Sequence, residues 1–90
     1  MKFDHNQICT TGHEVVVGNQ YQYSEDGYIA DVTILADEGD DEGIGFKLRV
    51  DKPLNGGFAK GAEFSCWAAK GHYAYSGMWR LYDLDTYAKP

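Results

Sequence analysis

Residues 44–51 are Ile-Gly-Phe-Lys-Leu-Arg-Val-Asp, the most regular alternation of apolar and polar side chains in the chain. Successive side chains of a β-strand point to opposite faces of its sheet, so a strand with one buried face is predicted here. The side chains predicted to point inward are Ile44, Phe46, Leu48 and Val50. The intervening glycine and charged residues are predicted to face solvent.

Segments before this strand are also predicted to be extended. Residues 20–23 alternate glutamine and tyrosine, and residues 28–36 place apolar side chains on both faces, as expected for a bent strand of a small barrel. Residues 15–17 are a run of β-branched valines closed by Gly18-Asn19, a favourable turn. We therefore predict two short strands, joined tightly, before the longer one.

The segments after residue 51 are less regular. Residues 53–57, Pro-Leu-Asn-Gly-Gly, are predicted to break regular structure and to open a loop that runs to about Gly61. Apolar residues within 62–70 have both the i, i+3, i+4 spacing of a helix and the alternation of a strand, and the strand is favoured. Two further strands are predicted at 72–75 and 78–82, around a serine-glycine turn.

Together these segments predict an all-β fold with five to seven short strands and at most one short helix. Turns every eight to twelve residues are typical of a small antiparallel barrel or a sandwich. The strand and turn rhythm is similar to that of SH3-like barrels. We expect residues 1–90 to form a single small β-barrel domain, with loose ends at about 1–10 and 84–90.

Charge is unevenly distributed along the 90 residues, which carry 14 acidic and 8 Lys or Arg side chains. Ten of the acids but only one of the bases lie before Lys47. Part of this asymmetry is expected to be balanced across neighbouring strands. The net charge of −6 favours a protein partner with a basic surface, and makes binding to nucleic acid or an anionic membrane unlikely.

Several function classes lack the residues they need. No apolar run approaches the roughly 20 residues of a membrane span, and the first residues lack the apolar stretch of a signal peptide, so a cytoplasmic protein is expected. Cys9 and Cys66 form no CxxC pair, so both are expected to be reduced, and neither a zinc site nor another cofactor is predicted.

Catalysis is not predicted either. The three histidines, His5, His13 and His72, have no neighbours that suggest a general base or a metal site. No serine or cysteine stands in a nucleophile elbow, and the Gly-Ile-Gly at residues 43–45 starts a strand instead of a phosphate-binding loop. We therefore expect a protein without enzymatic activity.

An acidic segment, residues 37–43, separates two predicted strands. Its spacing does not match the ligand order of an EF-hand, so a solvated hairpin tip is favoured over a calcium site. As the more specific alternative, such a loop can provide electrostatic selectivity for a basic protein surface. The candidate residues are Asp37, Glu38, Asp40, Asp41 and Glu42.

Aromatic residues gather in the last third of the chain, where half of them are needed for a core. In strand register Trp67 points opposite to Phe64, and Trp79 opposite to Arg80, so one tryptophan is expected to reach the surface. Exposed tryptophan and tyrosine are frequent anchors of protein interfaces. The predicted aromatic contact surface consists of Trp67, Tyr73, Tyr75 and Trp79.

These features predict a small acidic protein-binding module. Two alternatives stay open: an acidic inhibitor or immunity-type protein that blocks a nucleic-acid-binding surface, and a nucleic-acid-binding barrel that stacks bases beside Lys47, Arg49 and Lys70. Reversing the charge of the acidic loop separates the three, because it should abolish the inhibitor, weaken the protein binder and strengthen the nucleic-acid binder. A monomer and a homodimer are both compatible with the sequence.

Overall fold

The structure is a computed structural model that describes residues 9–10, 15–70, 75–76 and 79–84. Within these ranges the fold is all-β, as predicted, and it has no helix long and apolar enough to cross a membrane. The strands are β1 (Cys9–Thr10), β2 (Gln20–Glu25), β3 (Tyr28–Asp37), β4 (Gly43–Asn55), β5 (Glu63–Lys70), β6 (Tyr75–Ser76) and β7 (Trp79–Asp83).

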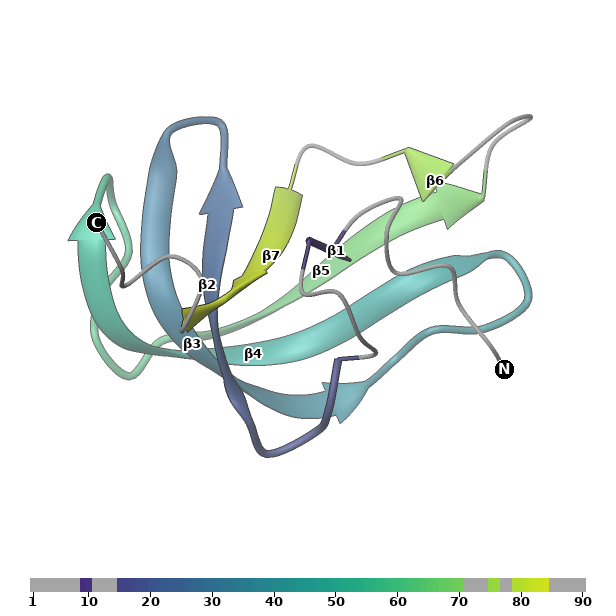
Figure 1. Ribbon diagram of the computed structural model, residues 1–90, viewed down its shortest axis with the longest axis horizontal. Helices are drawn as coiled ribbons and strands as arrows, with labels where there is room; N and C mark the ends of the chain where they lie inside the picture. The colour runs from purple at the N-terminus through teal and green to yellow at the C-terminus, as the bar shows by residue number, and fades with distance from the viewer. Residues whose placement is uncertain (1–8, 11–14, 71–74, 77–78, 85–90) are drawn as a thin grey trace.

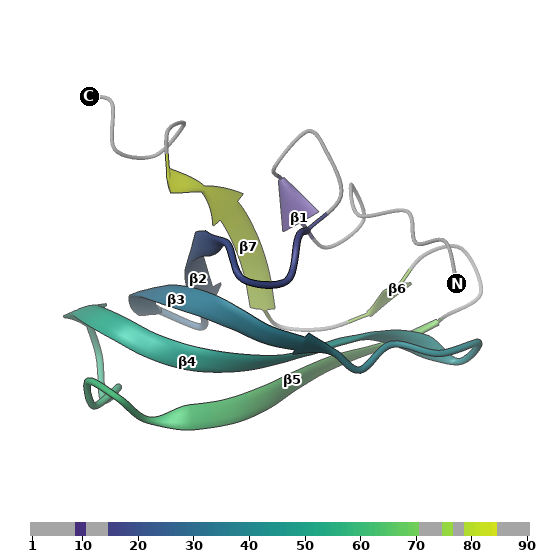
Figure 2. The same ribbon diagram turned by 90° about the horizontal axis from the view of Figure 1, so that it is seen from below.

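The strands form one sheet in the order β1-β7-β2-β3-β4-β5-β6. Every neighbouring pair is antiparallel except β1 with β7. Figure 1 and Figure 2 show that the five longer strands curl into a half-barrel, with the long β4 near its middle. The prediction of a small antiparallel barrel is confirmed at this level.

Strands β6 and β7 lie at opposite sides of the sheet order, although only two residues separate them in sequence. β6 pairs with β5, whereas β7 pairs with β2 and β1, so these strands do not form a hairpin with each other. Two residues span at most about 11 Å between flanking Cα atoms. The two sides of the sheet must therefore approach each other, as they do in a half-barrel.

The inner face of the curled sheet holds the core, and the predicted inward face of 44–50 is confirmed. In β4 the predicted apolar side chains are 0–1% exposed, and in β3 Ala30, Val32 and Ile34 are 0% exposed. The core is rich in aromatic rings because a small domain must cover its interior with few side chains. Its buried residues are Val15, Tyr21, Tyr23, Ala30, Val32, Ile34, Ile44, Phe46, Leu48, Val50, Cys66, Ala68, Trp79 and Leu81.

The predicted strand at residues 15–17 is wrong. Val15 is buried, but Val16 and Val17 are exposed and belong to no strand. Gly18 turns the chain with a φ of 95°, and the amide of Val16 donates to Tyr21 Oη at 2.9 Å. The Val16 amide thus bonds to a tyrosine hydroxyl instead of a strand, and the chain reaches β3 only at the turn, where Gly18 N donates to the carbonyl of Ile34 at 2.8 Å.

The predicted break at Pro53 is also wrong, because β4 continues to Asn55. Pro53 lies opposite Ala30 of β3, between two register shifts of the β3–β4 ladder. The β5 partner of β4 has already ended at the pair Arg49–Glu63. A residue without a backbone N–H is tolerated at such an edge and beside a bulge.

The ambiguous segment 62–70 forms the strand β5, as favoured. Cys66 and Ala68 are buried on the inner face, Phe64 is half-buried beside them, and Ser65 and Trp67 are exposed. Residue pairing with β4 extends over the segment, from Arg49–Glu63 to Gly43–Ala69. The alternation of β5 therefore sends its phenylalanine inward and its tryptophan outward.

Candidate functional site

Trp67 lies on the outer face of the half-barrel, and 44% of its surface is exposed. Its indole packs on β4 at two glycines: a Cβ added at Gly45 would lie 2.5 Å from Trp67 Cε3, and one at Gly43 would lie 2.7 Å from Trp67 Cζ2. Only glycine leaves room for the ring at these positions. The indole is thus supported by the sheet backbone and keeps much of its surface open to a partner.

The acidic loop lies next to this tryptophan. Residues 38–42 connect β3 to β4, so the loop ends at Gly43, and the amide of Glu38 donates to the carbonyl of Gly45 at 2.8 Å. The prediction of an exposed hairpin tip is confirmed for the five acidic side chains. The structure therefore brings together two predicted site elements, the Trp67 ring and the acidic loop.

Hydrogen bonds from backbone amides to aspartate carboxylates shape the acidic loop. Asp37 Oδ1 accepts a hydrogen bond from the amide of Gly39 at 2.9 Å, and Asp40 Oδ1 accepts one from the amide of Glu42 at 2.7 Å. Such Asx turns are a common role of aspartate in loops. Asp41 and Glu42 are exposed, and no group of three or more His, Cys, Asp or Glu among the described residues is arranged to hold a metal ion.

Trp79 is not part of the exposed aromatic surface, which corrects its assignment to the predicted contact site. It is 3% exposed, stacks on Tyr23 at a centroid distance of 6.2 Å and meets Phe46 edge to face at 6.3 Å. Its Nε1 donates to the carbonyl of Trp67 at 2.9 Å. Side chains alternate along β7 as predicted. The pairing of β7 with β2 places Trp79 and Leu81 on the inner face.

The remaining aromatic members of the predicted surface cannot be placed. Tyr73 and the side chain of Tyr75 lie outside the described residues, and Tyr75 is placed only through its backbone pairing with Lys70 in β6 and β5. Of the predicted contact residues, the structure therefore shows Trp67 and the acidic loop, residues 37–42, exposed and close together.

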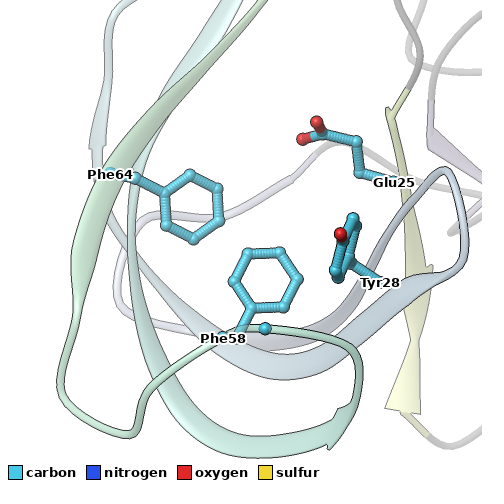
Figure 3. A pocket seen from close by; sticks show the side chains of 5 residues that line it. Glu25, Tyr28, Phe58 and Phe64 are labelled. Atoms are coloured by element: carbon cyan, nitrogen blue, oxygen red, sulfur yellow. The ribbon is translucent and has the colours of Figure 1, made fainter.

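A pocket, which the sequence analysis missed, opens between the end of β2, the start of β3 and β5. This pocket has a volume of about 310 Å³ and is lined by Glu25, Tyr28, Gly57, Phe58 and Phe64. Figure 3 shows three aromatic rings around the space, with the Glu25 carboxylate extending over it. Phe58 and Phe64 stack at 5.3 Å, while Tyr28 meets Phe58 edge to face at 5.9 Å.

Contacts between loops preform this pocket. Asn55 Nδ2 donates to the carbonyl of Gly27 at 3.0 Å, which ties the end of β4 to the β2–β3 turn. The Tyr28 ring lies so close to Gly56, whose φ is 92°, that no Cβ could be accommodated there. Tyr28, which forms one wall of the pocket, is therefore held between the β2–β3 turn and the end of β4.

Below the pocket, the hydroxyl of Tyr23 donates a hydrogen bond to Glu25 Oε1. Burial raises the pKa of the Tyr23 hydroxyl above its ordinary value, and the hydrogen bond to Glu25 raises it further. Tyr23 therefore stays a neutral donor over the whole physiological pH range. It orients the carboxylate at the pocket from inside the core.

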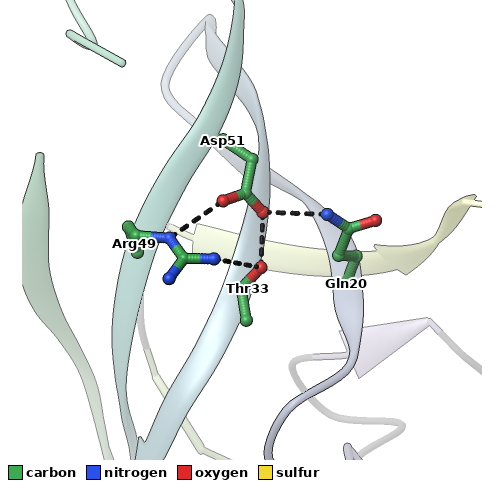
Figure 4. Close-up of polar contacts among 4 residues, drawn as sticks. All are labelled: Gln20, Thr33, Arg49 and Asp51. Carbon is green, nitrogen blue, oxygen red and sulfur yellow. Dashed lines mark hydrogen bonds and ion pairs between the residues drawn. The ribbon is translucent and has the colours of Figure 1, made fainter. Parts of the chain in front are cut away.

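A polar cluster occupies the outer face of β2, β3 and β4 (Figure 4). Asp51 accepts hydrogen bonds from Gln20 Nε2 at 3.2 Å, from Arg49 Nε at 3.0 Å and from the Thr33 hydroxyl. Burial alone would raise the pKa of Asp51, but these hydrogen bonds and the Arg49 charge together lower it. The cluster is internally satisfied and ties the strands together, so we interpret it as structural.

Sequence signals for the pocket were weak but present. Glu25 continues the inward series of Tyr21 and Tyr23 in β2, so its position on the inner face follows from the same alternation. Phe58, in contrast, stands in a loop where no periodicity applies. Comparison of the chain with known protein families, with curated proteins and with solved structures finds no match.

Proposed function

We propose that this protein is a small, non-enzymatic binding module that recognises a Lys- or Arg-rich protein segment in the cytoplasm. The observation that carries the proposal is the seating of the half-exposed Trp67 ring on Gly43 and Gly45, directly beside the acidic loop. An indole face attracts a cationic side chain, and neighbouring carboxylates strengthen this attraction.

Binding at this surface requires little rearrangement. Trp67 rests on rigid backbone, and the loop is held by its Asx turns, so little conformational entropy is lost when a partner binds. The acidic side chains are exposed, so their attraction falls with salt. Extended peptides in the aromatic groove of SH3-like barrels are a precedent for this type of contact.

Of the two alternatives, the nucleic-acid-binding barrel fits the surface less well. A nucleic-acid-binding barrel needs free cations near the exposed ring, but Lys47 pairs with Glu63 at 3.6 Å and Arg49 pairs with Asp51 at 3.0 Å. The side chain of Lys70, the third cation of this alternative, lies outside the described residues. An acidic inhibitor would use the same loop as the proposed module. It would differ in its target, a folded basic surface in place of an extended segment.

The proposal is tested with two synthetic octapeptides, one rich in lysine and arginine and one rich in glutamate, titrated into the protein at about 20 mM and 150 mM salt. Two-dimensional amide NMR spectra report the contact surface. We expect the basic peptide to shift the amides of residues 37–45 and of Trp67, with tighter binding at low salt. The acidic peptide should produce no shift.

A matched pair of variants separates local from global charge. Asp41→Asn removes one charge from the loop, and Asp26→Asn removes the same charge at an exposed position in the β2–β3 turn. The loop variant should bind the basic peptide several-fold more weakly than the control, and Trp67→Ala should lose most of the binding while keeping a folded spectrum. Equal losses in the two charge variants, or unchanged binding in Trp67→Ala, would refute the site.

A further inference from the structure

We propose that the pocket between Glu25, Tyr28, Phe58 and Phe64 binds an alkylated ammonium group, such as that of a methylated lysine or of choline. The pocket is separate from the Trp67 surface, because β5 turns Phe64 inward and Trp67 outward. The inference is therefore independent of the proposed function. It concerns a second ligand site at the open end of the half-barrel.

The aromatic lining is suited to a soft cation. Tyr28 and Phe58 stand nearly perpendicular to each other, at 77°, and Phe58 and Phe64 lie nearly parallel, at 19°. Ring faces carry negative electrostatic potential, and several of them around one space attract a cation within about 6 Å of their centroids. Tyr28 is 46% exposed, so its ring is accessible from solvent.

Glu25 supplies charge complementarity. Of the five residues that line the pocket, it is the one that carries a charge, and its carboxylate extends over the space in Figure 3. The hydrogen bond from Tyr23 occupies Oε1 and orients the carboxylate. A neutral apolar ligand would take water away from this carboxylate without compensation, whereas a cation pairs with it.

The lining also discriminates among cations. An unmodified ammonium group has three N–H donors; Glu25 and the Tyr28 hydroxyl can accept from some of them, but the Phe58 and Phe64 rings that form the rest of the wall offer no acceptor. Alkyl groups remove these donors and add apolar surface that packs against the rings. The volume of about 310 Å³ is at the lower end for small-molecule sites, which fits a single head group or side chain.

The experiment titrates the protein with five probes: choline, tetramethylammonium, blocked Nε-trimethyl-lysine, blocked lysine, and 3,3-dimethylbutanol as the uncharged isostere of choline. Amide and aromatic NMR shifts at Tyr28, Phe58 and Phe64 report binding. We expect the alkylated cations to bind at least about five-fold more tightly than lysine and the neutral isostere. The preference between choline and trimethyl-lysine identifies the source of the head group.

Two variants test the lining. Glu25→Gln keeps an acceptor for Tyr23 but removes the charge, and should weaken binding of the alkylated cations about five-fold or more. Phe58→Leu keeps apolar packing but removes a ring, and should weaken binding of the alkylated cations by a similar factor. Trp67→Ala should leave this binding unchanged. Equal binding of choline and its neutral isostere, absence of shifts at the pocket, or undiminished binding by Glu25→Gln in a folded protein would overturn the proposal.

Discussion

The two tryptophans lie on opposite faces of the same curled sheet and differ in almost every physical property. Trp79 is 3% exposed and surrounded by core rings, whereas Trp67 is 44% exposed and rests on glycine backbone. A hydrogen bond from Trp79 Nε1 to the Trp67 carbonyl joins their two strands. Strand register, and not residue type, therefore decides whether a tryptophan of this sheet is buried in the core or exposed on the outer face.

Truncating each tryptophan to alanine tests this difference most directly. Trp79→Ala removes a buried ring and leaves the Trp67 carbonyl without its donor, and should lower the free energy of unfolding by about 3–5 kcal/mol. Trp67→Ala should cost only about 1 kcal/mol, because its ring is half-exposed. Urea unfolding at pH 7 measures both. Similar losses for the two variants would contradict the contrast.

A methyl group at Gly45 should disturb the outer tryptophan most, because the carbonyl oxygen of Cys66 lies farther from the added Cβ, at 3.1 Å. The added Cβ would overlap Trp67 Cε3, so Gly45→Ala should move the indole off β4 and lower the free energy of unfolding by about 1–3 kcal/mol. The fluorescence of Trp67, recorded in a Trp79→Phe background, should shift toward that of a fully exposed indole. Unchanged emission would show that the ring does not depend on the glycine.

The contribution of Tyr23 to stability on the inner face can be tested at alkaline pH. Its folded-state pKa is raised, so its contribution to stability is fully present below the unfolded value near 10 and is lost as pH rises above it. Tyr23→Phe should cost about 1–1.5 kcal/mol at pH 7 and should flatten the decline in stability above pH 10. Urea midpoints between pH 8 and pH 11 test this, and parallel curves for the two proteins would refute it.

Asp51 provides the matching test on the outer face, at acid pH. Its folded-state pKa is lowered, so its contribution is present above the unfolded value near 3.9 and is lost as pH falls through the folded value. Asp51→Asn should cost about 0.5–1 kcal/mol at pH 7 and should reduce the loss of stability between pH 5 and pH 2. If Asp51→Asn loses stability between pH 5 and pH 2 as steeply as the unmodified protein, the ionised Asp51 does not stabilise the fold.

Local patterns in the sequence predicted much of the framework. The alternation of 44–50 predicted the correct inward face of β4, and that of 62–70 predicted that Phe64 and Trp67 point to opposite faces of β5, because side-chain direction alternates along a strand. The acidic segment between β3 and β4 was correctly predicted as a hairpin tip. Failures came at Val15–Val17 and Pro53, where a tyrosine hydroxyl and an edge position overrode local propensity.

The site was predictable only in part, for the same reason. Alternation showed that Trp67 and Trp79 each point away from their strand neighbours, but the inner face was decided by pairing of β7 with β2. The support of Trp67 by Gly43 and Gly45 needs the β4–β5 register, and the pocket needs the Phe58 loop to fold back over Tyr28. Such contacts depend on residues far apart in the chain.

The amino-acid sequence by itself determined the strand content, the buried stripe of β4 and the charge of the hairpin loop, because these depend on composition and on a period of two residues. Tertiary structure alone decided which tryptophan is buried, that the exposed one lies beside the acidic loop, and that three aromatic rings meet Glu25 around one pocket. These outcomes depend on curling and register, which place distant segments together and which no local pattern encodes.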